Sequence, residues 1–290
     1  MSKKHTLSHE LLRELFKLQC LGVSKAQQRI IEHTRNPKEI FGKETSETYK
    51  KHCRAFGRWC QAKYNIRKPY KAKKYVKEYL EMKQAQHLSP SSIKTIASAL
   101  AKVFHVSYTS FGVEFKERKR ADIKRSRTVP DPKIEEKAKE VISFIKATGL
   151  RRHEVLMVMP EEITEEKDGK MYVFVRQGKG GRKRHALVLP EYQSFIKKLK
   201  EGHEEKEPIF KSIPRNVQAH YYRAVYAQSV YQMVARDVAS LPRSEKYYMR
   251  ADRKGEVYDR KAMLFVSRQL GHNRIDVIAG HYLYTAKEIS

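Results

Sequence analysis

The chain has 290 residues, with 61 lysines and arginines against 33 aspartates and glutamates, so its formal net charge is +28 at pH 7. An excess of this size indicates a polyanionic partner, and nucleic acid is favoured over a membrane because no long apolar run or signal-like start occurs. Hydrophobic residues make up 40% of the chain, which excludes a disordered protein and suffices for two domains with separate cores.

The cysteines are Cys20, Cys53 and Cys60. Their odd number and the lack of a C-x-x-C pair exclude a disulfide framework and a zinc knuckle. We therefore expect a reducing compartment, in which these residues pack as small hydrophobic side chains.

Residues 1–43 are predicted to form an N-terminal helical extension, and residues 44–115 are predicted to form a helical domain. In the extension, SHELLRELFKLQCLG places leucines on one helix face. In the domain, apolar residues recur at three- and four-residue steps in TSETYKKHCRAFGRWCQAKY, KAKKYVKEYLEMKQA and SPSSIKTIASALAKVFHV. The last of these segments opens with Ser89 as N-cap and Pro90 at the first helical position, which predicts a helix start there.

Residues 116–132 are predicted to be a linker, because a run of basic side chains is followed by Pro130 and Pro132. A basic linker can lie along a phosphate backbone, and a solvated tether fits the same composition equally well. The candidate DNA-binding residues of this segment are Lys116, Arg118, Lys119, Arg120, Lys124, Arg125 and Arg127.

Residues 133–290 predict a second domain that combines helices with a small sheet. KIEEKAKEVISFIKATG predicts an amphipathic helix that stops at Gly149. MYVFVRQGKGGRKRHALVLP predicts a β-hairpin that turns between Gly178 and Gly181. Further helices are expected in EYQSFIKKLKEG, AHYYRAVYAQSVYQMVARDVASL and KAMLFVSRQLGHN. The predicted fold class is therefore mainly α with a small antiparallel β-sheet (α+β).

Five basic side chains and one tyrosine of this domain lie at element ends or in tight turns. Two guanidiniums can each bind two phosphate oxygens, histidines donate or shuttle protons near neutral pH, and a lysine can protonate a leaving oxygen. A tyrosine hydroxyl can attack phosphorus, while arginines supply the charge that a metal ion supplies elsewhere. The candidate set is Arg151, Lys179, His220, Arg223, His272 and Tyr282.

The segments TGLRRHE, GKGGRKR, HYYR, LGHNRID and HYLY, in this order, resemble the motif series of the tyrosine recombinases (phage-integrase family). The resemblance covers about residue 44 to the end of the chain. It implies a helical core-binding domain followed by a mixed catalytic domain. It also implies that all six candidates are catalytic, with Tyr282 as the nucleophile and Glu154 as the acid that supports Arg151.

Two features depart from the family pattern. The family's tyrosine usually lies nine residues after the histidine of L-G-H, where this chain has His281. Tyr282 needs the smaller shift, and Tyr284 is the alternative nucleophile. The stretch between Arg223 and His272 also contains an extra tyrosine-rich segment, RSEKYYMRADRKGEVYDRKA, with a turn at Lys254-Gly255. Packing, DNA contact and protomer contact are all compatible with that segment.

The resemblance implies a site-specific DNA recombinase or integrase of a mobile genetic element, with DNA integration or transposition as its role. Such an enzyme cuts and rejoins DNA through a 3′-phosphotyrosyl intermediate, without metal, ATP or another cofactor. The implied partners are double-stranded DNA with recombination sites, a homo-tetramer on that DNA, and an accessory directionality or DNA-bending protein. The implied location is cytoplasmic and nucleoid-associated, in a prokaryotic or viral system.

Other interpretations remain open on the sequence. A type IB topoisomerase-like or resolvase activity would use the same chemistry, and a non-enzymatic DNA-binding factor could have the same fold. A metal-dependent nuclease is disfavoured because the motifs lack clustered carboxylates. Arg152, His153 and Arg184 are expected to contact the DNA backbone or to pack, since the motifs give them no catalytic place.

Overall fold

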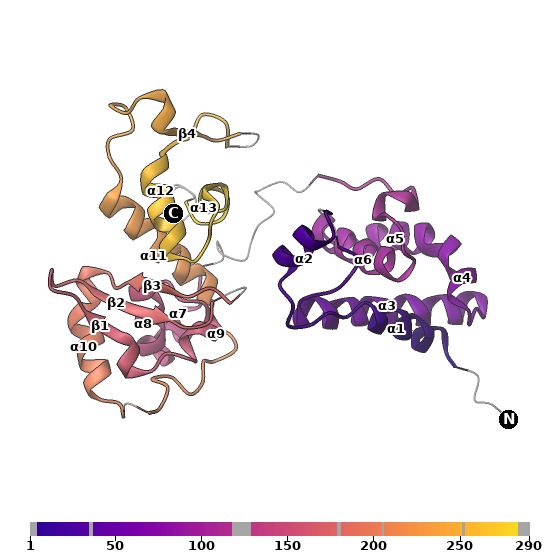
Figure 1. Ribbon diagram of the computed structural model, residues 1–290, viewed down its shortest axis with the longest axis horizontal. Coiled ribbons are helices and arrows are strands. Elements are labelled where there is room, and N and C mark those ends of the chain that lie inside the picture. Colours follow the sequence, from indigo (N-terminus) through magenta and orange to yellow (C-terminus); the bar gives the residue numbers. More distant parts are fainter. Residues whose placement is uncertain are drawn as a thin grey trace. The chain divides into compact units, whose positions relative to one another are not determined.

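The computed structural model describes residues 5–34, 37–117, 129–178, 181–204, 206–250 and 253–283. The chain divides into two compact units, Met1–Arg118 and Lys119–Ser290 (Figure 1). Each unit has its own hydrophobic core.

The first unit is helical throughout its described part. Its α-helices are α1 (Leu7–Lys17), α2 (Lys25–Ile31), α3 (Lys43–Tyr64), α4 (Pro69–Ala72), α5 (Val76–Ala85) and α6 (Pro90–Val103). Helix α6 begins as predicted, because the Ser89 hydroxyl accepts a hydrogen bond from the Ser92 amide at 3.2 Å and Pro90 takes the first helical position.

Helix α1 lies within the core of the first unit. Leu7, Leu11 and Leu15 are fully buried and belong to the same cluster as Phe56 of α3. The two helices touch at Gly57, where a Cβ atom would lie 2.8 Å from the Ser8 backbone, so only glycine permits this approach. The helix of the predicted N-terminal extension therefore shares its core with the predicted core-binding domain.

The cysteines behave largely as expected from the sequence. Cys53 and Cys60 are buried in the first core, and Cys20 is half-buried. Burial raises the pKa of the Cys53 and Cys60 thiols to about 12, so both stay protonated near neutral pH.

The second unit combines helices with two small antiparallel sheets. Its α-helices are α7 (Pro132–Lys137), α8 (Lys139–Thr148), α9 (Arg152–Val155), α10 (Gln193–Glu201), α11 (Ala219–Val234), α12 (Arg260–Gln269) and α13 (Ile275–His281). Its strands are β1 (Ile163–Glu165), β2 (Met171–Val175), β3 (Arg184–Leu187), β4 (Lys246–Tyr248) and β5 (Val257–Asp259). The predicted fold class is confirmed.

The three-stranded sheet has the order β1-β2-β3, and β2 with β3 forms the predicted hairpin. Met171, Val173 and Val175 alternate into the core, where they share a cluster with Val141 and Ile145 of α8. Strand β1 was not predicted, because three residues carry too little periodicity to mark a strand.

Two predicted helices differ from the observed ones. The helix expected over 133–149 is two helices, since Ala138 has φ −119° and ψ 25°. The helix expected over 219–241 ends at Val234. There the chain turns away because the Arg236 guanidinium and amide bond the buried Asp259 carboxylate, with Nε 2.8 Å from Oδ2.

The tyrosine-rich extra segment forms a second hairpin, in which β4 pairs antiparallel with β5. The predicted turn at Lys254-Gly255 lies between the two strands, and Gly255 has φ +104°. In the part of the chain that the structure describes, no helix is long and apolar enough to cross a membrane.

Candidate active site

The glycine at the end of α8 positions the first candidate arginine. Gly149 caps the helix in the left-handed conformation at φ +63°, and its amide bonds the Ile145 carbonyl at 2.8 Å. A Cβ atom here would lie 2.2 Å from Cδ1 of the Tyr226 ring. After the buried Leu150, Arg151 takes the N-cap position of α9. The helix stop therefore places Arg151 at a packed junction between two helices.

Glu154 fixes both the backbone and the side chain of Arg151. One carboxylate oxygen accepts the Arg151 amide at 2.8 Å, and the other accepts Nη1 at 2.8 Å. The same carboxylate receives Arg184 from β3, with Nη1 at 3.0 Å and Nη2 at 2.7 Å. The Glu154 side chain is fully buried between these two guanidiniums.

The charge of Glu154 is stabilised by its partners. Burial alone raises the pKa of this carboxyl, but hydrogen bonds and charge from Arg184, together with the Arg151 amide, outweigh burial and lower it to about 2. Glu154 is therefore ionised over the whole physiological range and holds Arg151 as an ion-paired cation.

Arg184 is a supporting residue whose role the sequence motifs did not suggest. A signal for it exists in the hairpin register, because Arg184 stands opposite Val175, which faces the core. A charged side chain at an inward position needs a buried counter-ion. Its Nε also donates to the Gln269 carbonyl at 2.8 Å, which links β3 to the end of α12.

Arg223 is fully buried and projects from α11. Its guanidinium donates to the carbonyls of Gly149 and Leu270, and its Nε lies 3.3 Å from the Tyr282 hydroxyl. Burial lowers the pKa of Arg223 to about 10, which still leaves it protonated at neutral pH. It is thus a fixed positive charge that joins the ends of α8 and α12 to Tyr282.

His272 and Tyr282 meet beside this charge. His272 follows Gly271 at the end of α12, where its amide bonds the Ser267 carbonyl at 2.7 Å. Its Nε2 lies 3.3 Å from the Tyr282 hydroxyl and 3.4 Å from Nη2 of Arg151. Tyr282 caps α13 and is 7% exposed. Four of the six candidates therefore converge: Arg151, Arg223, His272 and Tyr282.

A cavity of about 460 Å³ lies beside the buried arginine, and His220, which is exposed at the start of α11, lines it together with Arg151 and Arg223. The wall also includes Arg152 and Arg215, and Arg152 Nη2 donates to the Pro214 carbonyl at 2.9 Å. Four arginines around one cavity suit an anion. Arg215 was missed in the sequence, although it stands directly before the helix that carries His220.

Several predicted site residues lie outside the described part of the chain: Lys179, Tyr284, Arg118, Lys119, Arg120, Lys124, Arg125 and Arg127. The turn around Lys179 is bounded by described residues, since the Gly178 amide bonds the Arg182 carbonyl at 2.8 Å. His281, nine residues after His272, is the last residue of α13 and is half-buried.

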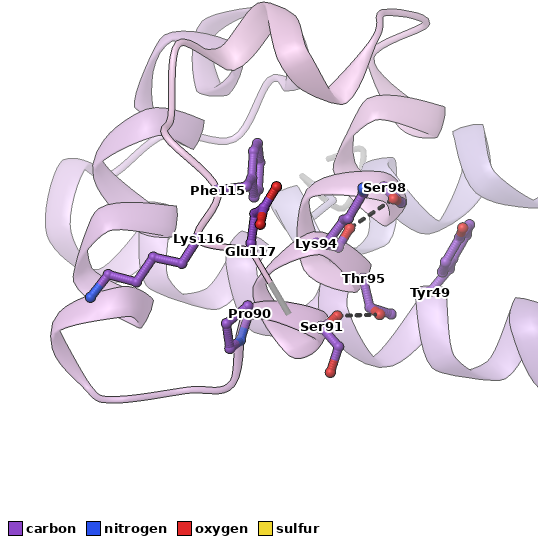
Figure 2. A pocket seen from close by; sticks show the side chains of 9 residues that line it. All are labelled: Tyr49, Pro90, Ser91, Lys94, Thr95, Ser98, Phe115, Lys116 and Glu117. Atoms are coloured by element: carbon purple, nitrogen blue, oxygen red, sulfur yellow. Dashed lines mark hydrogen bonds between the residues drawn. The ribbon is translucent and has the colours of Figure 1, made fainter. Parts of the chain in front are cut away.

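The first unit has a cavity of about 750 Å³ along α6, between this helix and residues 115–117 (Figure 2). The exposed Lys94, Lys116 and Glu117 line this cavity, as do Ser91, Thr95 and Ser98. Lys94 Nζ lies 5.1 Å from the centre of the Tyr108 ring. With two lysines and one glutamate this polar surface has a net positive charge, which suits contact with phosphate.

No family model and no curated protein matches the sequence. Similar folds do occur among solved structures. The XerH site-specific recombinase is similar in its post-cleavage complex with palindromic difH substrate and in its pre-cleavage complex with difH, with TM-scores of 0.54 and 0.51. In both comparisons the identity is 14%, and the alignment covers 98% of this chain and 92% of XerH. The Tn1549 transposon integrase in complex with circular intermediate DNA has a TM-score of 0.48 at 11% identity, over 98% of this chain and 97% of its own.

The likeness to XerH spans both units and extends over nearly the whole chain. On this evidence the chain has the fold of the tyrosine site-specific recombinases.

Proposed function

We propose that this protein is a site-specific DNA recombinase of the integrase type, with Tyr282 as its nucleophile. One observation carries the proposal: the Tyr282 hydroxyl lies 3.3 Å from both Arg223 Nε and His272 Nε2. A phenol held between a buried guanidinium and an imidazole has a charge to stabilise its phenolate and a base to take its proton. Helix α11 carries Arg223, while His272 follows the end of α12 and Tyr282 caps α13.

The first step we assign is cleavage of one DNA strand. His272 accepts the Tyr282 proton, and the phenolate oxygen attacks the phosphorus. The bond from phosphorus to the 5′-oxygen breaks, which leaves a 3′-phosphotyrosine and an alkoxide that Lys179 protonates. Arg151, Arg223 and His220 bind the non-bridging oxygens, whose charge increases in the transition state.

Rejoining reverses this chemistry. The 5′-hydroxyl of a partner strand attacks the phosphotyrosine, a new phosphodiester forms, and Tyr282 takes back a proton. Each step exchanges one phosphate ester for another, so the bond energy is conserved and no ATP is needed. The buried arginines supply the positive charge, and we therefore assign no metal to the reaction.

The proposed partner is duplex DNA that carries recombination sites. A net charge of +28 and the exposed Lys94 and Lys116 support it, as does the fold shared with XerH, which was solved on difH DNA. The resemblance to the tyrosine recombinases further implies a homo-tetramer on this DNA, an accessory directionality or DNA-bending protein, and a mobile element as the source.

The test is covalent trapping on nicked suicide DNA taken from the junctions of the host element. Wild type should form an SDS-stable adduct that is lost in Tyr282→Phe and kept in Tyr284→Phe. Arg151→Ala should lower the adduct rate by about 10²- to 10³-fold, as loss of one oxyanion donor does. Tight binding without an adduct would leave a non-enzymatic DNA-binding factor. Relaxation of plasmid without a recombination site would instead indicate a topoisomerase-like activity.

A further inference from the structure

The β4–β5 hairpin, which is the tyrosine-rich extra segment, packs on the end of the helix that carries Tyr282. Met249, which follows β4, is buried in one cluster with Ile278, Ala279 and Tyr282. The rings of Tyr247 and Tyr258 are partly buried against the same cluster. The hairpin thus shares a core with residues 275–283, which carry the proposed nucleophile and are called the nucleophile segment below.

A buried arginine of this hairpin holds the end of α13. Arg253 is 9% exposed, and its guanidinium donates to the Ala279 carbonyl inside the helix and to the Leu283 carbonyl beyond it. Glu256 holds the guanidinium in place and balances its charge, with Oε1 2.7 Å from Nε. The last carbonyls of a helix have no partner within it, so donors from another element fix where the chain goes next.

Tyr258 strengthens the same attachment. Its hydroxyl lies 2.7 Å from the Leu283 carbonyl and 2.6 Å from Oε2 of Glu256, and with one proton it can donate to only one of them. It also accepts a hydrogen bond from Arg253. Burial and the bond to Glu256 raise the pKa of Tyr258, so the hydroxyl remains a donor at neutral pH.

The backbone of Tyr282 is therefore held from two sides. Gln228 of α11 donates to the Tyr282 carbonyl at 3.1 Å, and Arg253 binds the carbonyls of Ala279 and Leu283 on either side of it. The position of the Tyr282 hydroxyl depends on the orientation of this backbone. A small rotation of the segment would move its hydroxyl away from Arg223 and His272.

We infer that the β4–β5 hairpin is a clamp for the nucleophile segment and that Arg253 is a positioning residue for Tyr282. This inference rests on the proposed function, because it needs Tyr282 to be the attacking group. It gives the extra segment between Arg223 and His272 a role within its own protomer, in which it supplies donors to the end of α13.

The experiment compares Arg253→Met with wild type in three measurements on the full chain: DNA affinity, adduct rate on nicked suicide DNA, and hydrogen exchange of residues 275–283. Exchange reports the clamp without reference to catalysis, since the Tyr282 and Leu283 amides bond the Ile278 carbonyl at 2.9 and 3.0 Å. We expect the DNA affinity to be kept, exchange in 275–283 to accelerate about tenfold or more, and the adduct to form about 10²-fold more slowly.

Arg236→Met is the matched control. Arg236 pairs with Glu245 and Asp259 at the base of the same hairpin, and within the described part of the chain none of its hydrogen bonds or ion pairs reaches residues 279–283. It should leave exchange in 275–283 and the adduct rate at the wild-type level. Arg253→Lys should recover part of the adduct rate, because an ammonium keeps the positive charge but lacks the planar, five-donor geometry with which the guanidinium binds Ala279, Leu283 and Glu256 at once.

If Arg253→Met fails to fold, Tyr258→Phe replaces it, with an expected loss of adduct rate of roughly fivefold for one hydrogen bond. Wild-type exchange and adduct rate in the Arg253 and Tyr258 variants would overturn the inference, as would faster exchange spread evenly over the second unit. A third outcome is faster exchange of residues 275–283 in Arg253→Met together with no adduct in the wild type. That result would refute the proposed function but would support the contact between the hairpin and α13.

Discussion

Glu154 lies between the guanidiniums of Arg151 and Arg184 with no exposure to solvent. A carboxylate in that position is costly to bury alone, and its two partners offset this cost through three side-chain N–H donors and the Arg151 amide. Removing the carboxylate or one of the guanidiniums would leave the opposite charge buried without its partner. Glu154 therefore couples the stability of the second unit to the geometry of its site.

The pH dependence of stability should report this coupling. The pKa of Glu154 falls from its ordinary value of 4.5 to about 2 on folding, so its contribution is complete above pH 4.5 and is lost as the pH falls towards 2. A tenfold change in proton affinity is worth about 1.4 kcal/mol, so the contribution is about 3 kcal/mol. We expect Glu154→Gln to lower the free energy of unfolding at pH 7 by about that amount, and the difference from wild type to shrink between pH 4.5 and 2.

Urea unfolding of the two proteins over this pH range measures the effect. Glu165→Gln is the control, because its ion pair with Lys197 is about half exposed and should contribute about 0–1 kcal/mol. A difference between Glu154→Gln and wild type that stays constant across the range would contradict the assignment.

Gly149 at the end of α8 allows both the turn of the chain and the close packing of α11 at the same point. Gly149→Ala should destabilise the protein by about 2–4 kcal/mol, because a side chain there meets the Tyr226 ring and the residue has positive φ. Gly169→Ala is the matched control: φ is +75°, but nothing lies within 4 Å of the added Cβ, so the cost should be about 1 kcal/mol. Thermal unfolding separates the two, and equal losses would show that the contact with Tyr226 is unimportant.

Helix α1 should contribute directly to the stability of the first unit. Leu11→Ala should lower the free energy of unfolding of the first unit by about 2–5 kcal/mol, since Leu11 is fully buried against the other helices of that unit. Phe16→Ala should change it little, because Phe16 is 68% exposed. A neutral Leu11→Ala, measured by denaturant unfolding, would mean that α1 does not contribute to this core.

The elements that the sequence predicted correctly are those specified by neighbouring residues. The Ser89-Pro90 start of α6, the Gly149 stop and the β2–β3 hairpin each depend on a few adjacent positions. The end of α11 at Val234 depends instead on Asp259, which lies 23 residues after Arg236. No local pattern encodes such a partner, and periodicity alone therefore extended the helix too far.

The residues of the candidate site also fall into two groups: those that the sequence identifies and those whose role depends on distant packing. Order and residue type identified Arg151, Arg223, His272 and Tyr282, which the fold brings together. The support from Arg184 and the contact between Arg253 and Leu283 depend on the packing of distant strands and loops. The contact of Arg253 needed the structure, because a basic residue in a +28 protein carries little information by itself, whereas the inward position of Arg184 in the hairpin was a usable signal.

For the whole molecule, the excess of positive charge predicts DNA binding that weakens steeply with salt. Each phosphate contact lowers the slope of log K against log salt concentration by about 0.9, so Lys94→Gln and Lys116→Gln should each make the slope less negative by about 1. Lys170→Gln should leave it unchanged, since Lys170 is ion-paired with Asp168 in the turn before β2. Binding titrations at several salt concentrations measure the slope, and identical slopes for all four proteins would exclude the α6 surface from the interface.

The proposed function requires that Tyr282 forms the covalent bond to DNA. The most direct measurement is tandem mass spectrometry of the trapped adduct after digestion with nuclease and trypsin. Cleavage after Arg274 and Lys287 releases IDVIAGHYLYTAK, which contains both Tyr282 and Tyr284 and can be fragmented between them. We predict that the nucleotide is attached to Tyr282. A nucleotide on Tyr284 or on another residue would contradict the claim.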